Sequence, residues 1–570
     1  MSDHASGPQM VGEQPEVDSV APVPKVATPS DDPSEAIGAG AEAGMASRVK
    51  RGVAWFLSNL LLSRGLSFIA FLVLGLILNK DEVGVWATAF ALSVFAQIFK
   101  DGGVVYLIPQ RGEREYERII GPVYWMAMAF NLGVAGVLLA MAFPAAAYFG
   151  NPMYVPVLAG IAIAVPLATP ATVFTATLQM RLRFATVSRI SIASSVLRNV
   201  TLVAGAAAGL GPLCFVVPMI VGAVFESIAG YVATRESPWR RGPAFSRWPE
   251  LFGASKWLIV TVLAYAGFNQ GGYLALGLIA HEEEVGVFFV AYQLVLQVDT
   301  MLNFGVGFVL MGAFARINDD PARQQAAAMR SARALAIVAA PATIGLAVVF
   351  QPFERMVWGG KWADAAPAAM FIALFCTWRI VFAIPATAAQ ARGQWRFYAL
   401  TTLAGGLGIM LAMLAGALVS PTATSAGVAM GLSMLVVIGG LYVLGMSRLN
   451  ITASRSIGAV LPPWLVGVAA AACVLGAARL AAPWLQGMET TVHRLAARAA
   501  AWAGAGPELA GRAGVSAAAG SMLLLLGVAF GKLYLVGLRV LTPDAVRDAL
   551  ALAPARLRPH AERFLMMRAT

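Results

Sequence analysis

The sequence predicts an all-α polytopic membrane protein with about fourteen transmembrane helices, arranged as two pseudo-symmetric six-helix bundles followed by two C-terminal helices. Of its 570 residues, 59% are hydrophobic and only 12% are charged. Soluble domains average about 45–50% apolar and roughly 25% charged residues. Long uncharged segments recur, and residues 400–446 alone are long enough for two spans of about 20 residues each. A sequence repeat, described below, relates two parts of the chain.

The apolar segments are expected to be helices because lipid leaves no partner for backbone hydrogen bonds, and because they are longer than barrel strands and do not alternate. Hydropathy places the spans at about 52–78, 84–108, 119–143, 154–180, 190–210, 213–234, 254–280, 285–312, 334–351, 365–391, 397–419, 424–447, 459–482 and 514–540.

The basic residues test this topology. With the N-terminus on the inner side, the inner loops through the twelfth span contain nineteen Lys and Arg residues, and the outer loops contain three. This asymmetry is the positive-inside rule, and one missed span would reverse every later loop. The net charge of +11 therefore indicates membrane topology and not nucleic-acid binding. We expect an inner-membrane protein with both termini in the cytoplasm.

The repeat lies at equivalent places in the two halves. Residues 74–85 read LGLILNKDEVGV and residues 276–287 read LGLIAHEEEVGV. Each copy covers the end of one span, a short acidic outer loop and the start of the next span. Two six-helix halves in the same orientation are a transporter architecture, with the substrate path between them. A purely structural duplication is the alternative.

These features predict five regions. A polar, Pro/Ala-rich tail without a signal peptide comes first, and a basic tail suited to anionic headgroups, or simply solvated, comes last. The regions are a disordered cytoplasmic tail at 1–47, the N-terminal bundle at 48–250, the C-terminal bundle at 251–450, two extra spans at 451–541 enclosing a partly helical outer segment at 483–514, and the cytoplasmic tail at 542–570.

Motifs for catalysis, metal binding or nucleotide binding are absent from the sequence. None of the four histidines lies in the middle of a span, and the three cysteines lie in apolar stretches without metal-type spacing. The sequence therefore indicates no catalytic residue, no metal site, no cofactor and no nucleic-acid partner. A glycan polymerase would need a catalytic outer loop, for which Glu489 and His493 within 483–514 are the only basis.

Charges inside the membrane are the main functional candidates. They are Arg64 in the first span, Arg198 in the fifth, Glu226 in the sixth, Asp299 in the eighth and Arg379 in the tenth. A charge at the bilayer centre costs about 2.5–3.5 kcal/mol on insertion scales, so such residues face a cavity or pair with each other. Arginine binds phosphate oxygens, which favours a cationic cleft for an anionic headgroup. Interhelical ion pairs, such as Arg198 with Glu226, are the alternative.

Two polar segments complete the candidate site. On the eighth span, Gln293 and Gln297 share one face, while Asp299 and Asn303 share another, offset by about 160°. Asp299 and Glu226 are candidates for ion coupling, although helix packing explains such residues equally well. On the seventh span, Asn269 and Gln270 stand among Gly267, Gly271 and Gly272, as in the interrupted helices that line transporter cavities. Close helix packing is the other interpretation.

Several motifs at helix ends resemble the polysaccharide flippases of the MATE-like superfamily, especially the lipopolysaccharide and exopolysaccharide exporters. The resemblance covers roughly residues 50–450. The motifs are Glu82-Val83-Gly84-Val85, Lys100-Asp101-Gly102-Gly103, Leu107-Ile108-Pro109-Gln110, Leu178-Gln179-Met180-Arg181-Leu182-Arg183-Phe184, Trp358-Gly359-Gly360-Lys361-Trp362 and Ala391-Arg392-Gly393.

This resemblance implies two six-helix bundles in a V-shaped fold. It implies transfer of undecaprenyl-diphosphate-linked oligosaccharide across the inner membrane by alternating access, with membrane lipids and other polysaccharide assembly proteins as partners. Relatives often carry an acid where this chain has Gly272-Tyr273-Leu274, so no coupling role transfers to that position. The lipid II flippases of the superfamily also have fourteen helices, which leaves the subfamily open.

The leading hypothesis is a flippase in which Arg64, Arg379 and Arg198, with Asn269 and Gln270, line the central cavity. The two arginines Arg64 and Arg379 would hold the diphosphate, and Asp299 would help to couple an ion gradient. The alternatives are a lipid II flippase, a small-molecule or cation antiporter on the same fold, a membrane polymerase or ligase, and a scaffold for a glycan-assembly complex.

Overall fold

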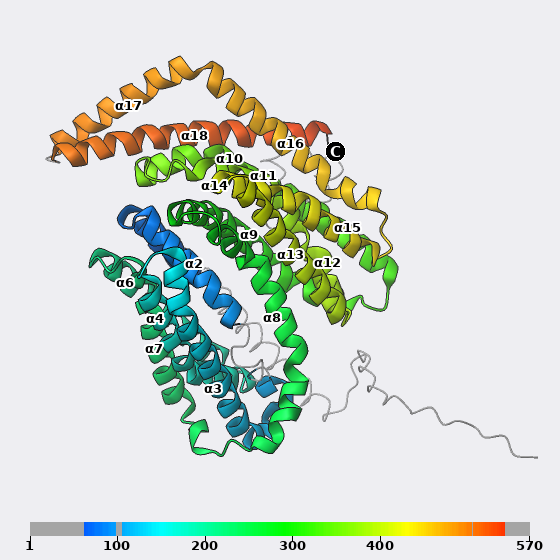
Figure 1. The fold of residues 1–570 in the computed structure, drawn as a ribbon. Coiled ribbons are helices and arrows are strands. Elements are labelled where there is room, and N and C mark those ends of the chain that lie inside the picture. The colour runs from blue at the N-terminus through cyan, green and yellow to red at the C-terminus, as the bar shows by residue number, and fades with distance from the viewer. Residues whose placement is uncertain (1–61, 98–104, 106, 504–505, 542–570) are drawn as a thin grey trace, which may run out of the picture. The chain divides into compact units, whose positions relative to one another are not determined.

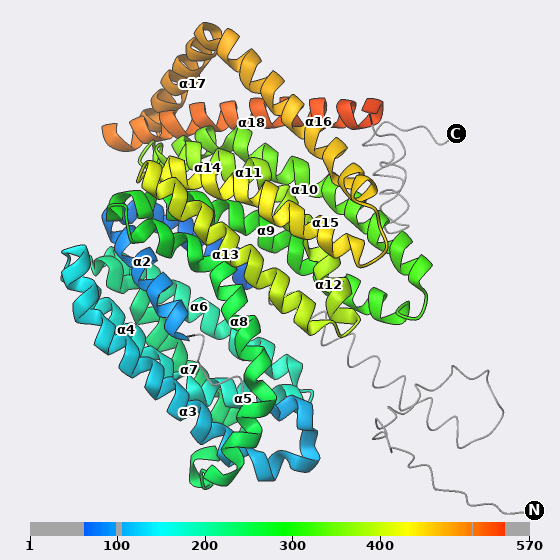
Figure 2. The same cartoon turned by 45° about the vertical axis from the view of Figure 1, so that its right-hand side comes forward.

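The computed structural model describes residues 62–97, 105, 107–503 and 506–541, and within these ranges the chain forms helices and no strand. The expected tails at 1–47 and 542–570 lie outside the described residues. The described residues all belong to one structural unit, so the predicted bundle boundary at residue 250, in the first turn of α8, stays a prediction. Figures 1 and 2 show the arrangement of the helices.

Helices of the first half follow the predicted order. The span predicted at 154–180 is two helices, because Pro166 and Pro170 flank a junction at Ala168. The chain also kinks at Gly112, whose φ is 70°. The elements are the helix Leu62–Ile77, α2 (Lys80–Gln97), α3 (Leu107–Phe149), α4 (Tyr154–Leu167), α5 (Thr169–Met180), α6 (Phe184–Ala207), the 3₁₀ turn η2 (Gly211–Phe215) and α7 (Val216–Thr234).

The second half begins with two short 3₁₀ turns and continues with long helices. They are η3 (Pro238–Arg240), η4 (Phe245–Arg247), α8 (Trp248–Gly277), α9 (Glu282–Arg316), α10 (Pro321–Trp358), α11 (Ala365–Val381), α12 (Ala383–Ala391), α13 (Trp395–Val419), α14 (Ala423–Ser433), the π-helical turn η5 (Met434–Ile438) and α15 (Gly439–Ser447).

The helix α10 is much longer than its predicted span of 334–351. Its N-terminus is set by the Asp320 carboxylate, which accepts a hydrogen bond from the backbone N–H of Arg323, and by Pro321 in the first turn. Gly359, with φ 67°, ends it in the left-handed conformation. Hydropathy detects only the apolar middle of such a helix, so the polar first turns were missed.

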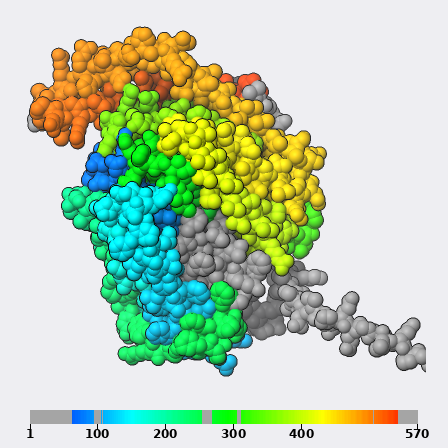
Figure 3. Space-filling model, in the orientation of Figure 1, coloured from blue at the N-terminus to red at the C-terminus, as the bar shows by residue number. Residues whose placement is uncertain are grey.

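The C-terminal region consists of α16 (Ala453–Leu480), α17 (Ala482–Trp502) and α18 (Pro507–Leu541). The expectation of a partly helical segment at 483–514 is confirmed. The helices α16 and α18 pack on α10, and Figures 1 and 3 show them on the side of the second half that faces away from the first.

Eleven helices in the described ranges are long and apolar enough to cross a membrane. Each of the other three predicted spans, 52–78, 84–108 and 254–280, includes residues that the structure does not describe, wholly or in their side chains. The chain is therefore a multi-pass membrane protein, with eleven of the fourteen predicted spans present by this criterion.

The two copies of the repeat pack against each other where α2 meets α9. A Cβ atom at Gly84 would overlap the carbonyl oxygen of Glu282, and one at Gly286 would overlap that of Lys80. Gly84 and Gly286 are equivalent positions of the repeat, and so are Lys80 and Glu282. The contact is thus reciprocal, as expected for halves related by a pseudo-two-fold axis, and glycine permits the close approach of the two backbones.

Further contacts join the halves at this end, which the topology predicts to be the outer one. Lys80 Nζ contacts Glu283 at 3.0 Å and Asp364 at 2.6 Å. The hydrogen bond to Asp364 raises the pKa of Lys80 above its usual value. Asn151 donates a hydrogen bond of 2.8 Å to Glu282, and therefore α2, α9 and the loop before α4 are held together.

The Trp-Gly-Gly-Lys-Trp motif ties the second half to the end of the helix Leu62–Ile77. Trp362 Nε1 donates to the carbonyl of Gly75 at 2.8 Å, and Lys361 Nζ donates to that of Leu76 at 3.2 Å. Both carbonyls lie in the last turn, where a helix has no internal partner for them. Burial lowers the pKa of Lys361. This motif therefore caps a helix of the other half.

Substitution of Gly84 or Gly286 by Ala should force the two helices apart. Because each added methyl group would meet backbone and not a flexible side chain, we expect a loss of about 1–3 kcal/mol of folding free energy, measured as a lower melting temperature of the purified full chain in detergent. Gly133→Ala, a helical position with nothing within 4 Å of the added Cβ, is the matched control and should not lower it. Equal melting temperatures for all three variants would contradict the close contact.

Candidate functional site

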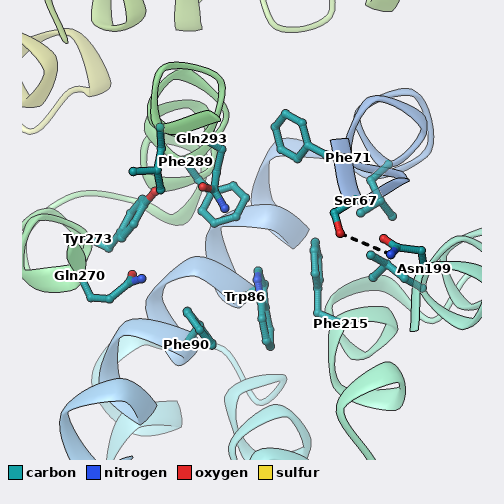
Figure 4. A pocket seen from close by; sticks show the side chains of 13 residues that line it. Ser67, Phe71, Trp86, Phe90, Asn199, Phe215, Gln270, Tyr273, Phe289 and Gln293 are labelled. Carbon is teal, nitrogen blue, oxygen red and sulfur yellow. Dashed lines mark hydrogen bonds between the residues drawn. The ribbon is translucent and has the colours of Figure 1, made fainter. Parts of the chain in front are cut away.

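A cavity of about 290 Å³ lies between the two halves. The first half contributes the helix Leu62–Ile77, α2, α6 and η2, and the second half contributes α8 and α9 (Figure 4). The described residues that line the cavity are aromatic, aliphatic or uncharged polar: Ser67, Phe71, Leu74, Trp86, Phe90, Asn199, Leu202, Phe215, Gln270, Tyr273, Phe289, Gln293 and Leu296.

Aromatic rings form one wall of the cavity. Trp86 stacks on Phe215 with ring centroids 4.7 Å apart and an angle of 6° between the rings, and it also stacks on Phe90 at 5.1 Å. Figure 4 shows this stack facing Phe71 and Phe289 across the cavity. Rings packed against each other in this way keep their orientation, so the wall is preorganised.

Neutral hydrogen-bonding groups line the rest. Asn199 donates a hydrogen bond of 2.7 Å to the carbonyl of Ser195 and a weaker one of 3.4 Å to Ser67 Oγ. By contrast, Gln270 Oε1 and the Tyr273 hydroxyl are buried and have no hydrogen-bond partner among the described residues. Buried polar atoms without a partner are rare in native proteins and need an explanation.

Arg379 lies at the centre of a buried polar network outside the cavity lining. Its guanidinium group donates to Asp299 at 3.3 Å, to the Tyr292 hydroxyl at 3.0 Å and to Asn269 Oδ1 at 2.8 Å. The ring of Phe268 lies 4.7 Å below it. The side chains of Arg379 and Asp299 are each only 6% exposed. This network joins α8, α9 and α11 within the second half.

Arg198 and Glu226 form the interhelical ion pair that the sequence offered as their structural interpretation. Arg198 contacts Glu226 at 3.0 Å, and Ser194 donates to the same carboxylate at 2.5 Å. Gly222 leaves room for the arginine side chain between α6 and α7. The pair is half-buried and neither residue lines the cavity.

Arg64 is exposed, and its carbonyl accepts a hydrogen bond of 3.4 Å from Gln297. It precedes Ser67 and Phe71 by three and seven residues, and residues so spaced share one face of a helix. Ser67 and Phe71 line the cavity. Arg64 therefore lies on the cavity face, one turn beyond the lining toward the N-terminus.

The two polar faces predicted on α9 are both present. Gln293 lines the cavity and Gln297 reaches the first half. On the other face, Asp299 accepts hydrogen bonds from Arg379 at 3.3 Å and from Asn303 at 2.7 Å. One helix thus presents amides to the space between the halves and a carboxylate to the interior of its own half.

The glycine-rich segment of the predicted seventh span, compared above with an interrupted helix, belongs to the continuous helix α8 from Trp248 to Gly277. Added Cβ atoms at Gly271 and Gly272 would meet Met410 and Met413 of α13, so these glycines serve close helix packing. Gln270, between them and Asn269, nevertheless lines the cavity. Close helix packing therefore explains Gly271 and Gly272, whereas Gln270 is a cavity-lining residue.

The site residues predicted from the sequence were charged or amide side chains, and the aromatic wall was not among them. Of the seven predicted site residues, Gln270 lines the cavity, Arg64 lies on its face, Asn269, Asp299 and Arg379 meet in the buried network, and Arg198 pairs with Glu226. Aromatic residues in apolar helices have no distinguishing pattern. The available signal was the repeat, which marks α2 and α9 as the helices that meet at the centre. Within the described residues, no group of His, Cys, Asp and Glu could hold a metal ion.

The fold of this chain, two helical halves with a cavity between them, is similar to the fold of solved MATE-like membrane proteins. The lipid II flippase MurJ in an inward closed conformation superposes with a TM-score of 0.64 at 10% identity, covering 87% of this chain and all of the other. An inward-facing multidrug resistance MATE family transporter of the MOP superfamily gives 0.53 at 12% identity, covering 68% and 94%.

The chain belongs to the polysaccharide biosynthesis protein family, whose model matches residues 73–367. The succinoglycan biosynthesis transport protein ExoT of Rhizobium meliloti (strain 1021) is 24% identical over 334 residues, which is 58% of this chain and 66% of ExoT. The lipopolysaccharide biosynthesis protein WzxC of Escherichia coli (strain K12) is 25% identical over 324 residues, 55% of this chain and 64% of WzxC. The chain thus spans just under two thirds of the length of each.

Loss of Arg379 should destabilise the fold. Because Arg379→Ala leaves the buried Asp299 carboxylate without its cation, we expect about 3–5 kcal/mol of lost stability, measured as a lower melting temperature of the purified full chain. The control is Arg323→Ala, whose exposed pair with Asp320 should contribute about 0–1 kcal/mol. Equal melting temperatures for the two variants would show that the Arg379 network does not stabilise the fold.

Proposed function

We propose that this protein moves a lipid-linked oligosaccharide, carried on undecaprenyl diphosphate, from the inner to the outer leaflet of the inner membrane for surface polysaccharide synthesis. The observation that carries the proposal is the cavity of about 290 Å³ between the two halves of a member of the polysaccharide biosynthesis protein family. Transporters with repeated halves bind substrate near the interface between them.

The proposal includes the topology predicted from charge, with both termini in the cytoplasm and the repeat loops on the outer side. The outer end is then the end at which Lys80, Glu282 and Glu283 join the halves. Alternating access requires those contacts to open while the inner end closes. The α2–α9 pair, which carries the reciprocal glycine contact, would be the element that rearranges.

Arg64 is our candidate for holding the diphosphate. It lies on the cavity face one turn nearer the inner side, where the diphosphate would follow the glycan, and its guanidinium group can form paired hydrogen bonds with phosphate oxygens. Arg379 is assigned a positioning role for α9 because its hydrogen bonds go to Asp299, Tyr292 and Asn269. Asp299 stays the candidate for ion coupling, since its protonation would weaken this network.

Other functions have less support. A small-molecule antiporter shares the fold, but the sequence family and the relatives ExoT and WzxC concern polysaccharide synthesis by name. The residues considered for a polymerase lie on α17, where Glu489 contacts Arg355 at 3.8 Å and His493 packs on Gly514 of α18.

Deletion of the gene tests the function. We expect completed lipid-linked oligosaccharide to accumulate on the inner leaflet, because synthesis continues while transfer stops. Extraction of the lipid-linked pool, with a probe of which leaflet holds it, measures this. Single repeat units stranded on the outer leaflet would indicate a polymerase instead, and an unchanged pool in a strain without a second transporter of this family would contradict the proposal.

Arg64→Ala tests the diphosphate role. Hydrogen bonds to a charged group contribute about 1.5–3 kcal/mol, so we expect export to fall roughly 10- to 100-fold, with a partial effect for Arg64→Lys because lysine lacks the paired donors. Export is measured as surface polysaccharide per molecule of membrane-inserted protein. The control is Arg323→Ala, which removes an exposed arginine outside the cavity and should leave export unchanged. Full export by Arg64→Ala would show that Arg64 does not hold the diphosphate.

A further inference from the structure

We propose that the helix α17 lies on the surface of the membrane, on the side that the charge asymmetry predicts to be outer, and binds anionic phospholipids there. Its apolar stripe, which consists of Trp484, Leu495 and Trp502, would enter the boundary of the acyl chains. Arg494 and Arg498 beside the stripe would contact the lipid phosphates. The inference uses the membrane topology alone and does not depend on the transported substrate.

The neighbours of α17 in the chain place it at a membrane surface. The helices α16 and α18 are both long and apolar enough to cross a membrane, whereas α17, with 21 residues, is not among the helices that meet this criterion. Only Ala481 separates α16 from α17, and residues 503–506 join α17 to α18. Both ends of α17 are therefore one short connection away from a span. Figures 1 and 2 show α17 diverging from α18 toward the end of α16.

Large apolar side chains form the stripe along α17. Trp484 and Trp502 are 18 residues apart, which is about five turns, and Leu495 comes about two turns before Trp502, so all three point to the same side of the helix. Each is more than half exposed, and Trp502 is 93% exposed. Tryptophan is enriched at membrane–water interfaces, where its ring lies at the level of the headgroups.

A different side of α17 packs on the protein. Leu485 is buried, Glu489 contacts Arg355 of α10 at 3.8 Å, and His493 lies beside Gly514 of α18. Positions 485, 489 and 493 are four residues apart and share one face of the helix. Because these contacts set the rotation of α17 about its own axis, the stripe stays outside the helix packing and is available to lipid.

Two arginines lie along one edge of the stripe. Arg494 and Arg498 are one turn apart and exposed, and neither forms an ion pair with a carboxylate in the part of the chain that the structure describes. An arginine beside an apolar face can keep its methylene groups on that face while its charged end reaches the headgroups. Its guanidinium group forms paired hydrogen bonds with phosphate oxygens. A basic edge beside Trp and Leu is typical of helices that lie in a membrane interface.

The stripe continues an apolar surface that begins on the neighbouring spans. Leu480, the last residue of α16, is 88% exposed, and Leu509 in the first turn of α18 is also mostly exposed. In water this combined apolar surface would be unfavourable, and large exposed apolar patches usually mark an interaction site. Since it adjoins two spans, the acyl chains of the same leaflet are the occupant that fits.

Spin labels on the full chain in lipid nanodiscs test the position of α17. The exposed Cys473 is first replaced by Ala, and Cys214 and Cys376, which are buried, remain. A single label is then placed on the stripe, with Leu495→Cys or Trp502→Cys. We expect these labels to collide more often with oxygen, which dissolves in lipid, than with a water-soluble nickel chelate.

The matched control is a label on the polar side of α17. Thr490→Cys, at an exposed position, should collide more often with the nickel chelate than with oxygen. Because the labelled positions lie outside the helix packing, each variant should melt at the temperature of the Cys473→Ala chain. Nickel accessibility of the stripe equal to that of residue 490 would overturn the proposal. Exclusion of both reagents would also overturn it, because the stripe would then be covered by protein, such as a second copy of this chain.

The charge of the lipid tests the two arginines. With a fluorophore on Leu495→Cys, brominated phosphatidylglycerol should quench more strongly than brominated phosphatidylcholine at the same mole fraction. The physical reason is that each basic residue near the surface enriches anionic lipid roughly fivefold. Arg494→Gln/Arg498→Gln should lose the difference, whereas Arg494→Lys/Arg498→Lys, which keeps the charge, should retain most of it. Equal quenching by the two lipids before the arginines are changed would overturn their contact with anionic lipid.

Discussion

The contact between α2 and α9 is the constraint on which the rest of the structure depends. It brings two backbones together through Gly84 and Gly286, and no side chain larger than hydrogen fits at either position. Every group that lines the cavity from α2 or α9 takes its position from this contact. Lys80 and Glu282 bond to neighbouring elements at the same end of the pair, and Trp362 caps the first described helix. These contacts fix the helix pair in the molecule.

Among the described residues, the buried charges lie apart from the cavity lining. The buried charges Arg379 and Asp299 satisfy each other inside the second half, with Tyr292 and Asn269 completing the set. The cavity contains amides, hydroxyls and rings. The separation arises on α9, where residues 293 and 297 face the first half while residues 299 and 303 face the interior. A helix with two polar faces can hold its own half rigid and still present hydrogen-bonding groups to a ligand.

Much of the fold could be predicted from the sequence, because lipid requires helices, hydropathy locates their apolar stretches, and the repeat marks the helices at which the two halves meet. The helix ends were less predictable: the long polar start of α10 depends on the Asp320 cap and not on hydropathy. Within the site, Arg198 and Glu226 were correctly offered as a pair. The pairing of Arg379 with Asp299 joins residues 80 positions apart, and no local pattern reveals such a contact. The aromatic wall was missed because Trp86 and Phe215 are ordinary apolar residues of membrane helices until the fold brings them together.

The reciprocal glycine contact is also one that a dimer of half-length chains could make. A contact in which each partner's glycine meets the other's carbonyl is self-complementary, so two identical half-length chains related by a two-fold axis would make it without any new residue. Fusion of such chains would free each copy to change separately. Trp86 and Phe90 on α2 correspond to Phe288 and Tyr292 on α9, yet the first pair faces the cavity and Tyr292 faces Arg379. The backbone contact between the two helices is thus still symmetric, whereas the side chains beside it differ and make the cavity asymmetric.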